Sequence, residues 1–268
     1  DDPRRFFSGG DNQIAGVGDG FERNSPPWIE TVRSLRDRFP VFGSMIEASE
    51  CLTRLVGQMN ALLWSAEEPE RFGRQVERIG EFYVRCADAA MSAAEGLLDG
   101  FVIWGDVAYR ENMFFDPAYW RTYYRPAVAE MVRLAHRRNL PVIYHGCGCM
   151  RAILPDLIEI GVDAVNPLEV KAGMDVADLR RDFGHRIALC GGADVRVWER
   201  DDPAEIRRDV QRCLRAAEGG GYIFQSDHSV SSSVSGHTYD AVVRLVRELG
   251  VYPLHLEPES PDSLRRVV

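Results

Sequence analysis

The sequence predicts an α/β fold and, among such folds, a (β/α)8 TIM barrel. Short apolar runs rich in β-branched residues alternate with longer segments of helical period, which is the pattern of parallel βαβ units. No predicted strand is followed by the Gly-rich fingerprint of a dinucleotide-binding, doubly wound sheet, which is the competing architecture. The 268 residues are 45% hydrophobic, enough for one large core, so we expect a single domain over residues 1–268.

Six strand–helix units can be placed along the chain. The predicted strands cover residues 40–46, 101–106, 141–145, 163–168, 187–190 and 222–226. The predicted helices cover residues 48–65, 69–97, 117–138, 149–160, 175–183, 203–218 and 237–249. The run 251–254 is a candidate seventh strand, and residues 1–38 form an irregular N-terminal segment. Because a complete barrel has eight strands, we expect the N-terminal part of the barrel to be missing from this chain.

Composition and charge exclude several classes of function. The formal net charge is -9 and the arginines are scattered, so we expect no nucleic-acid partner. No run approaches the roughly 18 apolar residues of a membrane span, so we expect no membrane association. Six cysteines at irregular spacing are too few for a disulfide scaffold, which favours a reducing, cytoplasmic location.

Polar and charged side chains close most of the predicted strands. In a (β/α)8 barrel the active site lies at the carboxyl ends of the strands, so these residues are the candidates for chemistry. They are Glu47, Asp106, His145, Cys147, Glu169, Cys190, Asp194, Asp227 and His228.

His145 and Cys147 stand two residues apart at the end of one predicted strand. Alternation along a strand points such side chains the same way, so both can reach one metal ion. Imidazole nitrogen and thiolate sulfur are ligands that zinc prefers, and a catalytic zinc takes three protein ligands. The competing interpretation is that His145 caps a Gly-rich turn and Cys147 is a small buried residue. Cys149 falls where the next helix begins and is predicted to be structural.

A third ligand is available at the end of the strand 222–226, where His228 precedes a Ser-rich loop. Two other interpretations stay open at this point. Asp227 and His228 can hydrogen-bond the loop backbone, or they can act as an acid–base pair without a metal.

Asp106 ends a strand that is otherwise apolar. A carboxylate in that place binds substrate, hydrogen-bonds a side chain that binds a metal, or hydrogen-bonds loop amides. Because position in a barrel is so predictive, we favour a catalytic role for Asp106. The same argument applies to Glu169.

Five segments together resemble the uroporphyrinogen decarboxylase superfamily over about residues 40–254. The resemblance is carried, in this order, by Trp104–Tyr109 followed by Asp116 and Pro117, by His145–Gly148, by Pro167–Asp175, by Gly191–Arg196 and by Gly219–Val230. The superfamily includes the decarboxylase and the zinc methyltransferases of corrinoid-dependent methyl transfer. The last segments look most like a poorly characterised branch with an Asp-His-Ser-Val loop.

The resemblance implies a zinc-dependent methyltransferase that moves a methyl group between a small substrate and a corrinoid (cobalamin) carried by a partner protein. In the methyltransferases a His-x-Cys pair and a distant Cys hold the zinc. His145 and Cys147 match the pair, and the distant Cys falls on His228, which changes the charge and softness of that ligand. The alternatives are a metal-free decarboxylase using Asp106 with Asp227 and His228, and a non-catalytic barrel that binds a corrinoid or tetrapyrrole.

Overall fold

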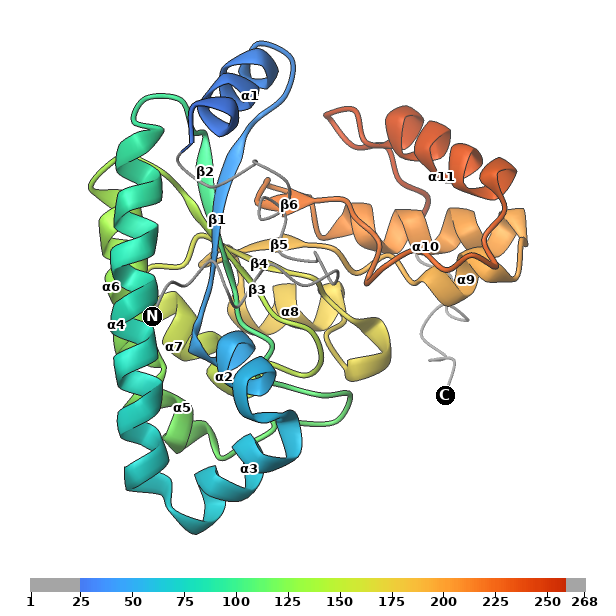
Figure 1. Ribbon diagram of the computed structural model, residues 1–268. Helices are drawn as coiled ribbons and strands as arrows, with labels where there is room; N and C mark the ends of the chain where they lie inside the picture. Colours follow the sequence, from blue (N-terminus) through green and yellow to red (C-terminus); the bar gives the residue numbers. More distant parts are fainter. Residues whose placement is uncertain (1–24, 259–268) are drawn as a thin grey trace. The chain divides into compact units, whose positions relative to one another are not determined.

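A computed structural model describes residues 25–258 of the chain, which divide into two compact units (Figure 1). The first unit holds the described residues up to Gly105 together with Ala118–Ile143. The second holds Asp106–Pro117 and the described residues from Tyr144 onward. Strand β3 (Val142–His145) therefore begins in the first unit and ends in the second.

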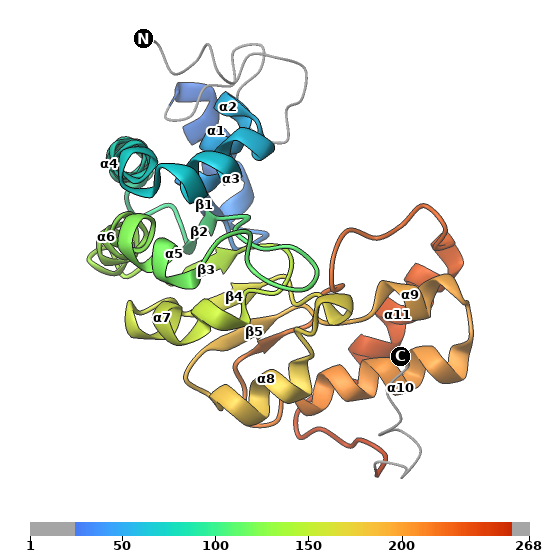
Figure 2. The same ribbon diagram turned by 90° about the horizontal axis from the view of Figure 1, so that it is seen from below.

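The first unit is built on two parallel strands and the start of β3. Its elements are α1 (Pro26–Arg36), β1 (Phe42–Ile46), α2 (Ala48–Val56), α3 (Gln58–Glu67), α4 (Pro69–Ala93), β2 (Gly100–Trp104), α5 (Pro117–Tyr123) and α6 (Arg125–His136). Strand β1 pairs with β2 from Phe42↔Gly100 to Ile46↔Trp104, and the Phe101 N–H donates to Pro141 O just before β3. Helices α4 and α6 lie side by side against β1 and β2 (Figures 1 and 2).

The second unit continues the same strand order. Its elements are η2 (Arg151–Ile153), α7 (Leu154–Glu159), β4 (Ala164–Asn166), η3 (Val170–Ala172), α8 (Val176–Phe183), β5 (Ala188–Cys190), α9 (Val195–Glu199), α10 (Pro203–Arg215), β6 (Tyr222–Ile223) and α11 (Gly236–Leu249). The Gly146 N–H donates to Asn166 O beyond the end of β3. Strand β4 pairs in parallel with β5, and β5 with β6. Helix α10 packs against α8, α9 and α11.

The predicted α/β class is confirmed, because all six predicted strands form and stand in chain order in a sheet. Chain order with helical crossovers is the arrangement of a (β/α)8 barrel, of which residues 25–258 supply six strands. Within these residues no helix is long and apolar enough to cross a membrane.

Three of the differences from the sequence prediction concern helices. The helix predicted over 48–65 divides at Gly57, whose φ of 81° ends α2. The helix predicted over 117–138 divides before Arg125–His136, because Pro126 has no N–H to continue the ladder. Helix α9 was not predicted. Its short start is capped by the Asp194 carboxylate, which accepts from the Arg196 N–H.

The candidate seventh strand at 251–254 is wrong, since these residues form bends. Val251 is 65% exposed and Tyr252 59% exposed, and Pro253 cannot donate to a neighbouring strand, so nothing favours pairing here. In the segment predicted to be irregular, residues 1–24 lie outside the described residues. Pro26–Arg36 form α1, which the Ser25 hydroxyl caps by accepting from the Trp28 N–H.

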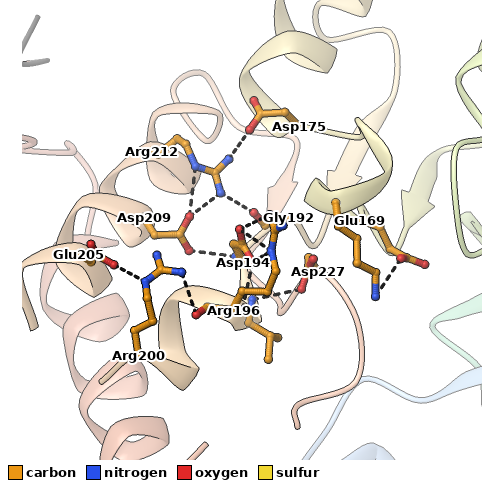
Figure 3. A network of polar contacts seen from close by, with 12 residues as sticks. Glu169, Asp175, Gly192, Asp194, Arg196, Arg200, Glu205, Asp209, Arg212 and Asp227 are labelled. Atoms are coloured by element: carbon orange, nitrogen blue, oxygen red, sulfur yellow. Dashed lines mark hydrogen bonds and ion pairs between the residues drawn. The ribbon is translucent and has the colours of Figure 1, made fainter. Parts of the chain in front are cut away.

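A charged network supports the loop after β5 (Figure 3). The Arg212 guanidinium donates to Asp175 at 2.8 Å, to Asp209 at 2.5 Å and to the Gly192 carbonyl at 2.7 Å. The second oxygen of buried Asp209 accepts from the Asp194 N–H at 3.0 Å. One side chain of α10 therefore ties together the start of α8 and the loop that leads from β5 into α9.

Candidate functional site

The candidate site lies at the carboxyl ends of the strands of the second unit. Strand β3 ends at His145, β4 at Asn166 and β5 at Cys190, while Gln225 and His228 follow β6. Because parallel strands end on the same edge of a sheet, side chains far apart in sequence meet here. Every residue of the predicted metal site and both predicted catalytic carboxylates belong to this unit.

Cys147 is the centre of the cluster. Its Sγ lies 3.4 Å from Nε2 of His228 and 3.8 Å from Nε2 of His145, and all three side chains are partly buried. The structure thus brings a thiol into contact with two imidazoles that are 83 residues apart in sequence, since 228 − 145 = 83. The pairing that strand alternation predicted for His145 and Cys147 is present in the geometry.

Two carboxylates hold the backbone around Cys147. The Cys147 N–H donates to Asp106 Oδ1 at 3.0 Å, and the next amide, that of Gly148, donates to Glu169 Oε1 at 2.9 Å. Glu169 is buried and its other oxygen lies 3.3 Å from Nζ of Lys171. Both carboxylates therefore fix the position of the thiol through the main chain, and a catalytic role for either stays a prediction.

Gly148 is required by the backbone at this point. Its φ is +77°, a conformation that L side chains rarely adopt, and an added Cβ would lie 2.5 Å from Tyr109 O. Tyr109 O also accepts from the Cys149 N–H at 2.8 Å, so the loop after Cys147 packs directly on the segment 107–113. This close approach fixes where Cys147 points.

Gly148→Ala is expected to destabilise the protein by about 2–4 kcal/mol, because left-handed strain and steric overlap with a backbone carbonyl add together. Gly173→Ala is the matched control, since Gly173 has nearly the same φ, +75°, with nothing within 4 Å of the added Cβ. It should cost about 1–2 kcal/mol. Denaturant unfolding of the two variants measures the difference. Equal losses would show that the contact with Tyr109 carries no cost.

Among residues 25–258, two groups of side chains have the composition of a metal site, and Cys147 belongs to both. One is Asp106, His145 and Cys147, and the other is Cys147, Glu169 and His228, with ligand atoms within 4.8 Å of one another in each. Zn–S and Zn–N bonds of about 2.3 and 2.1 Å at a tetrahedral angle separate sulfur and nitrogen by roughly 3.6 Å. The two observed S···N distances lie on either side of this value.

The donor set therefore fits zinc, with one adjustment. Within the described part of the chain the two imidazoles belong to different groups, so holding both on one ion requires one of them to turn toward the other. The His228 side chain is 39% exposed, which leaves it room to do so. Glu169 Oε1 lies 3.9 Å from His228 Nε2.

The pKa of His145 is lowered. Burial of the imidazole is the main cause, and the hydrogen bond with Asn166 acts in the opposite direction. The neutral imidazole is the form that binds metals. Cys190, at the end of β5, is buried, and burial raises the pKa of its thiol.

Comparisons with known proteins identify the family of the chain and several of its relatives. The family model described as "Uroporphyrinogen decarboxylase (URO-D)" matches residues 16–249. The chain belongs to the uroporphyrinogen decarboxylase family. A curated uroporphyrinogen decarboxylase of Shewanella pealeana is 27% identical over 190 residues, which cover 68% of this chain and 50% of the relative. A curated uroporphyrinogen decarboxylase of Thermus thermophilus is 26% identical over 246 residues, covering 85% and 66%.

A solved structure supports the same fold for this URO-D family member. A methyltransferase from Methanosarcina mazei superposes with a TM-score of 0.64 at 19% identity, covering 83% of this chain and 64% of that protein. At this identity the likeness concerns the fold. The chain spans about half the length of the Shewanella relatives and about two thirds of the Thermus and Methanosarcina proteins.

The structure places the remaining candidates of this URO-D family chain away from the cluster or in supporting positions. Asp227 is buried and binds backbone amides. Its carboxylate accepts from the amides of Val195 and Val170, and burial raises its pKa. Asp194 caps α9 and pairs with Arg196. Cys149 donates its backbone N–H to Tyr109 O and belongs to neither group of possible metal ligands in the described part of the chain, and its structural role stays a prediction.

Three residues of this URO-D chain were missed by the sequence analysis. Asn166 Oδ1 lies 2.7 Å from His145 Nδ1, and Asn166 Nδ2 donates to Gln225 Oε1. Lys171, paired with Glu169, is the single lysine among 32 basic residues, a signal that inspection of composition could have found. Asn166 lies inside the predicted strand 163–168, whereas the observed strand β4 ends at Asn166 and so places its side chain at the site.

Proposed function

We propose that this protein is a zinc-dependent methyltransferase that moves a methyl group between a small substrate and a corrinoid on a partner protein. The observation that carries the proposal is the position of Cys147 Sγ between the Nε2 atoms of His145 and His228. One thiolate with two imidazoles is a chemically reasonable donor set for a catalytic zinc, with a fourth position for substrate. The same three residues are the ones that the family resemblance assigns.

Zinc bound there would lower the pKa of a substrate thiol or polarise a methyl ether or alcohol oxygen. His145, Cys147 and His228 would hold the ion. Asp106 and Glu169 would keep the Cys147 loop in place through its amides, and their carboxylate oxygens lie close enough to orient a substrate. Of the three ligands only the Cys147 thiolate would carry a negative charge. The bound zinc ion would therefore keep a net positive charge and stay electrophilic.

Methyl transfer and the corrinoid rest on the family and on the solved methyltransferase of the same fold. A corrinoid carried by a partner needs an approach to the strand ends, where Gln225 is exposed and His228 partly so. The six cysteines, all of them in the described part of the chain, form no disulfide bond with one another, in keeping with the proposed cytoplasmic location.

A metal-free decarboxylase is the second candidate, favoured by the curated relatives that bear that name. In the form that uses Asp227 and His228 as an acid–base pair it has little support, because the Asp227 carboxylate is engaged by two backbone amides. Asp106 would then be the remaining acid for proton transfer.

Metal analysis combined with a corrinoid assay tests the proposal. The purified protein is expected to hold one zinc per chain and, with a thiol acceptor, to convert methylcob(III)alamin to cob(I)alamin, seen as a change in the visible spectrum. A protein without metal that decarboxylates a porphyrinogen would support the second candidate. Corrinoid binding without demethylation of a panel of thiols would support a non-catalytic barrel.

A further inference from the structure

A chain of hydrogen bonds runs across the ends of four strands to His145. The Cys190 thiol donates to Gln225 Oε1 at 3.1 Å, Asn166 Nδ2 donates to the same oxygen at 2.7 Å, and Asn166 Oδ1 lies 2.7 Å from His145 Nδ1. Asn166 Nδ2 also lies 3.5 Å from the Cys190 carbonyl. The residues come from the ends of β3, β4 and β5 and from the loop after β6.

The contacts favour one orientation of the Asn166 amide. Its Nδ2 lies 2.7 Å from Gln225 Oε1, 3.5 Å from the Cys190 carbonyl oxygen and 3.4 Å from Cys190 Sγ, and a flipped amide would place its own oxygen against the Cys190 carbonyl. Gln225 is oriented in the same way, because its Oε1 faces two donors, Asn166 Nδ2 and the Cys190 thiol. Burial raises the pKa of that thiol, which favours the form that donates.

We infer that Asn166 is a positioning residue that holds His145 as the Nδ1–H tautomer and so presents the lone pair of Nε2 to Cys147. An oxygen facing Nδ1 accepts only if that nitrogen carries the proton. Nε2 then has the lone pair, and it is Nε2 that lies 3.8 Å from Cys147 Sγ. The inference rests on the proposed function and deepens it, because this tautomer lets His145 Nε2 bind the same metal ion as Cys147 Sγ.

The hydrogen-bond partner of His145 Nδ1 is an amide, whereas a carboxylate often accepts the second N–H of a metal-bound histidine. The Asn166 oxygen fixes the tautomer and the ring plane without adding a charge to a site that already has Asp106 and Glu169 beside it. Loss of such an outer partner typically weakens metal affinity by about 10- to 100-fold. The geometry therefore predicts a graded series of effects along the chain of hydrogen bonds.

The first test concerns the tautomer and needs no metal. In metal-free protein labelled with ¹⁵N-histidine, the two-bond ¹H–¹⁵N spectrum should show His145 as the Nδ1–H tautomer, with its signals assigned by their loss in His145→Gln. Asn166→Leu should shift His145 toward the Nε2–H form. An Nε2–H tautomer in the unaltered protein, or an unchanged spectrum in Asn166→Leu, would overturn the inference.

The second test measures Zn²⁺ affinity by chelator competition. Asn166→Leu should bind about 10- to 100-fold more weakly than the unaltered protein. Gln225→Leu should lose less, because Asn166 keeps the Cys190 carbonyl, and Gln225→Glu should bind as the unaltered protein does, because it keeps the Oε1 acceptor. Thermal unfolding of each variant shows whether a loss reflects misfolding.

The two tests separate the inference from the function it serves. Zinc affinity that is unchanged in a folded Asn166→Leu variant contradicts the positioning role. Failure of the unaltered protein to bind zinc contradicts the proposed function, and the tautomer spectrum then still decides whether Asn166 fixes His145.

Discussion

Cys147→Ala should abolish stoichiometric zinc binding and, with it, methyl transfer. Cys147 is the one side chain common to both groups of possible ligands, and its sulfur contacts both imidazoles. Removing it leaves two imidazoles and no thiolate, so the loss of affinity should exceed the about 10- to 100-fold that follows loss of an outer partner. Elemental analysis of the purified variant and a zinc titration measure the effect.

The matched control for Cys147→Ala is Cys149→Ala. Cys149 lies two residues further on, is equally half-buried, and contributes its backbone N–H to Tyr109, which alanine retains. Its zinc content should equal that of the unaltered protein. Full zinc occupancy in Cys147→Ala, or loss of zinc from Cys149→Ala alone, would move the metal site away from Cys147.

The fold and the centre of the site were predictable because both depend on local patterns. Strand alternation brings the side chains of His145 and Cys147 to the same side whatever the rest of the chain does. The position of His228 could be predicted only as far as the end of its strand. Its contact with Cys147 depends on how β3 and β6 sit in the sheet, and the family resemblance supplied what spacing could not.

The supporting residues could not be predicted for a physical reason. Asn166 contacts Gln225 because parallel pairing places the ends of β4, β5 and β6 together. The sequence of one strand does not specify which residues of a neighbouring strand it pairs with, so this contact could not be predicted. Gly148 looked like one glycine among 24, and its close contact with Tyr109 appears only in three dimensions. The run 251–254 shows the converse, since apolar residues without a pairing partner form no strand.

Arg212→Met is expected to be the most destabilising change outside the site, at about 3–5 kcal/mol. Asp209, whose side chain is 6% exposed, would keep its charge without its partner, and Asp175 and the Gly192 carbonyl would lose donors. Arg244→Met is the control, because Arg244 and Asp240 form an exposed pair on α11 that should contribute about 0–1 kcal/mol. Urea unfolding of both variants gives the comparison.

The origin of the Arg212→Met loss can be separated by charge and by pH. Burial already raises the pKa of Asp209 and Arg212 opposes it, so the variant should raise that pKa further. The native state then binds more protons than the unfolded state, and stability falls as pH rises through the folded pKa, so the loss should be larger at pH 8 than at about pH 5. The double variant Arg212→Met/Asp209→Asn should recover about 1–3 kcal/mol, because it removes the unpaired charge but keeps an oxygen for the Asp194 N–H. A loss that is independent of pH and not recovered by Asp209→Asn would instead assign the cost to packing of the arginine stem.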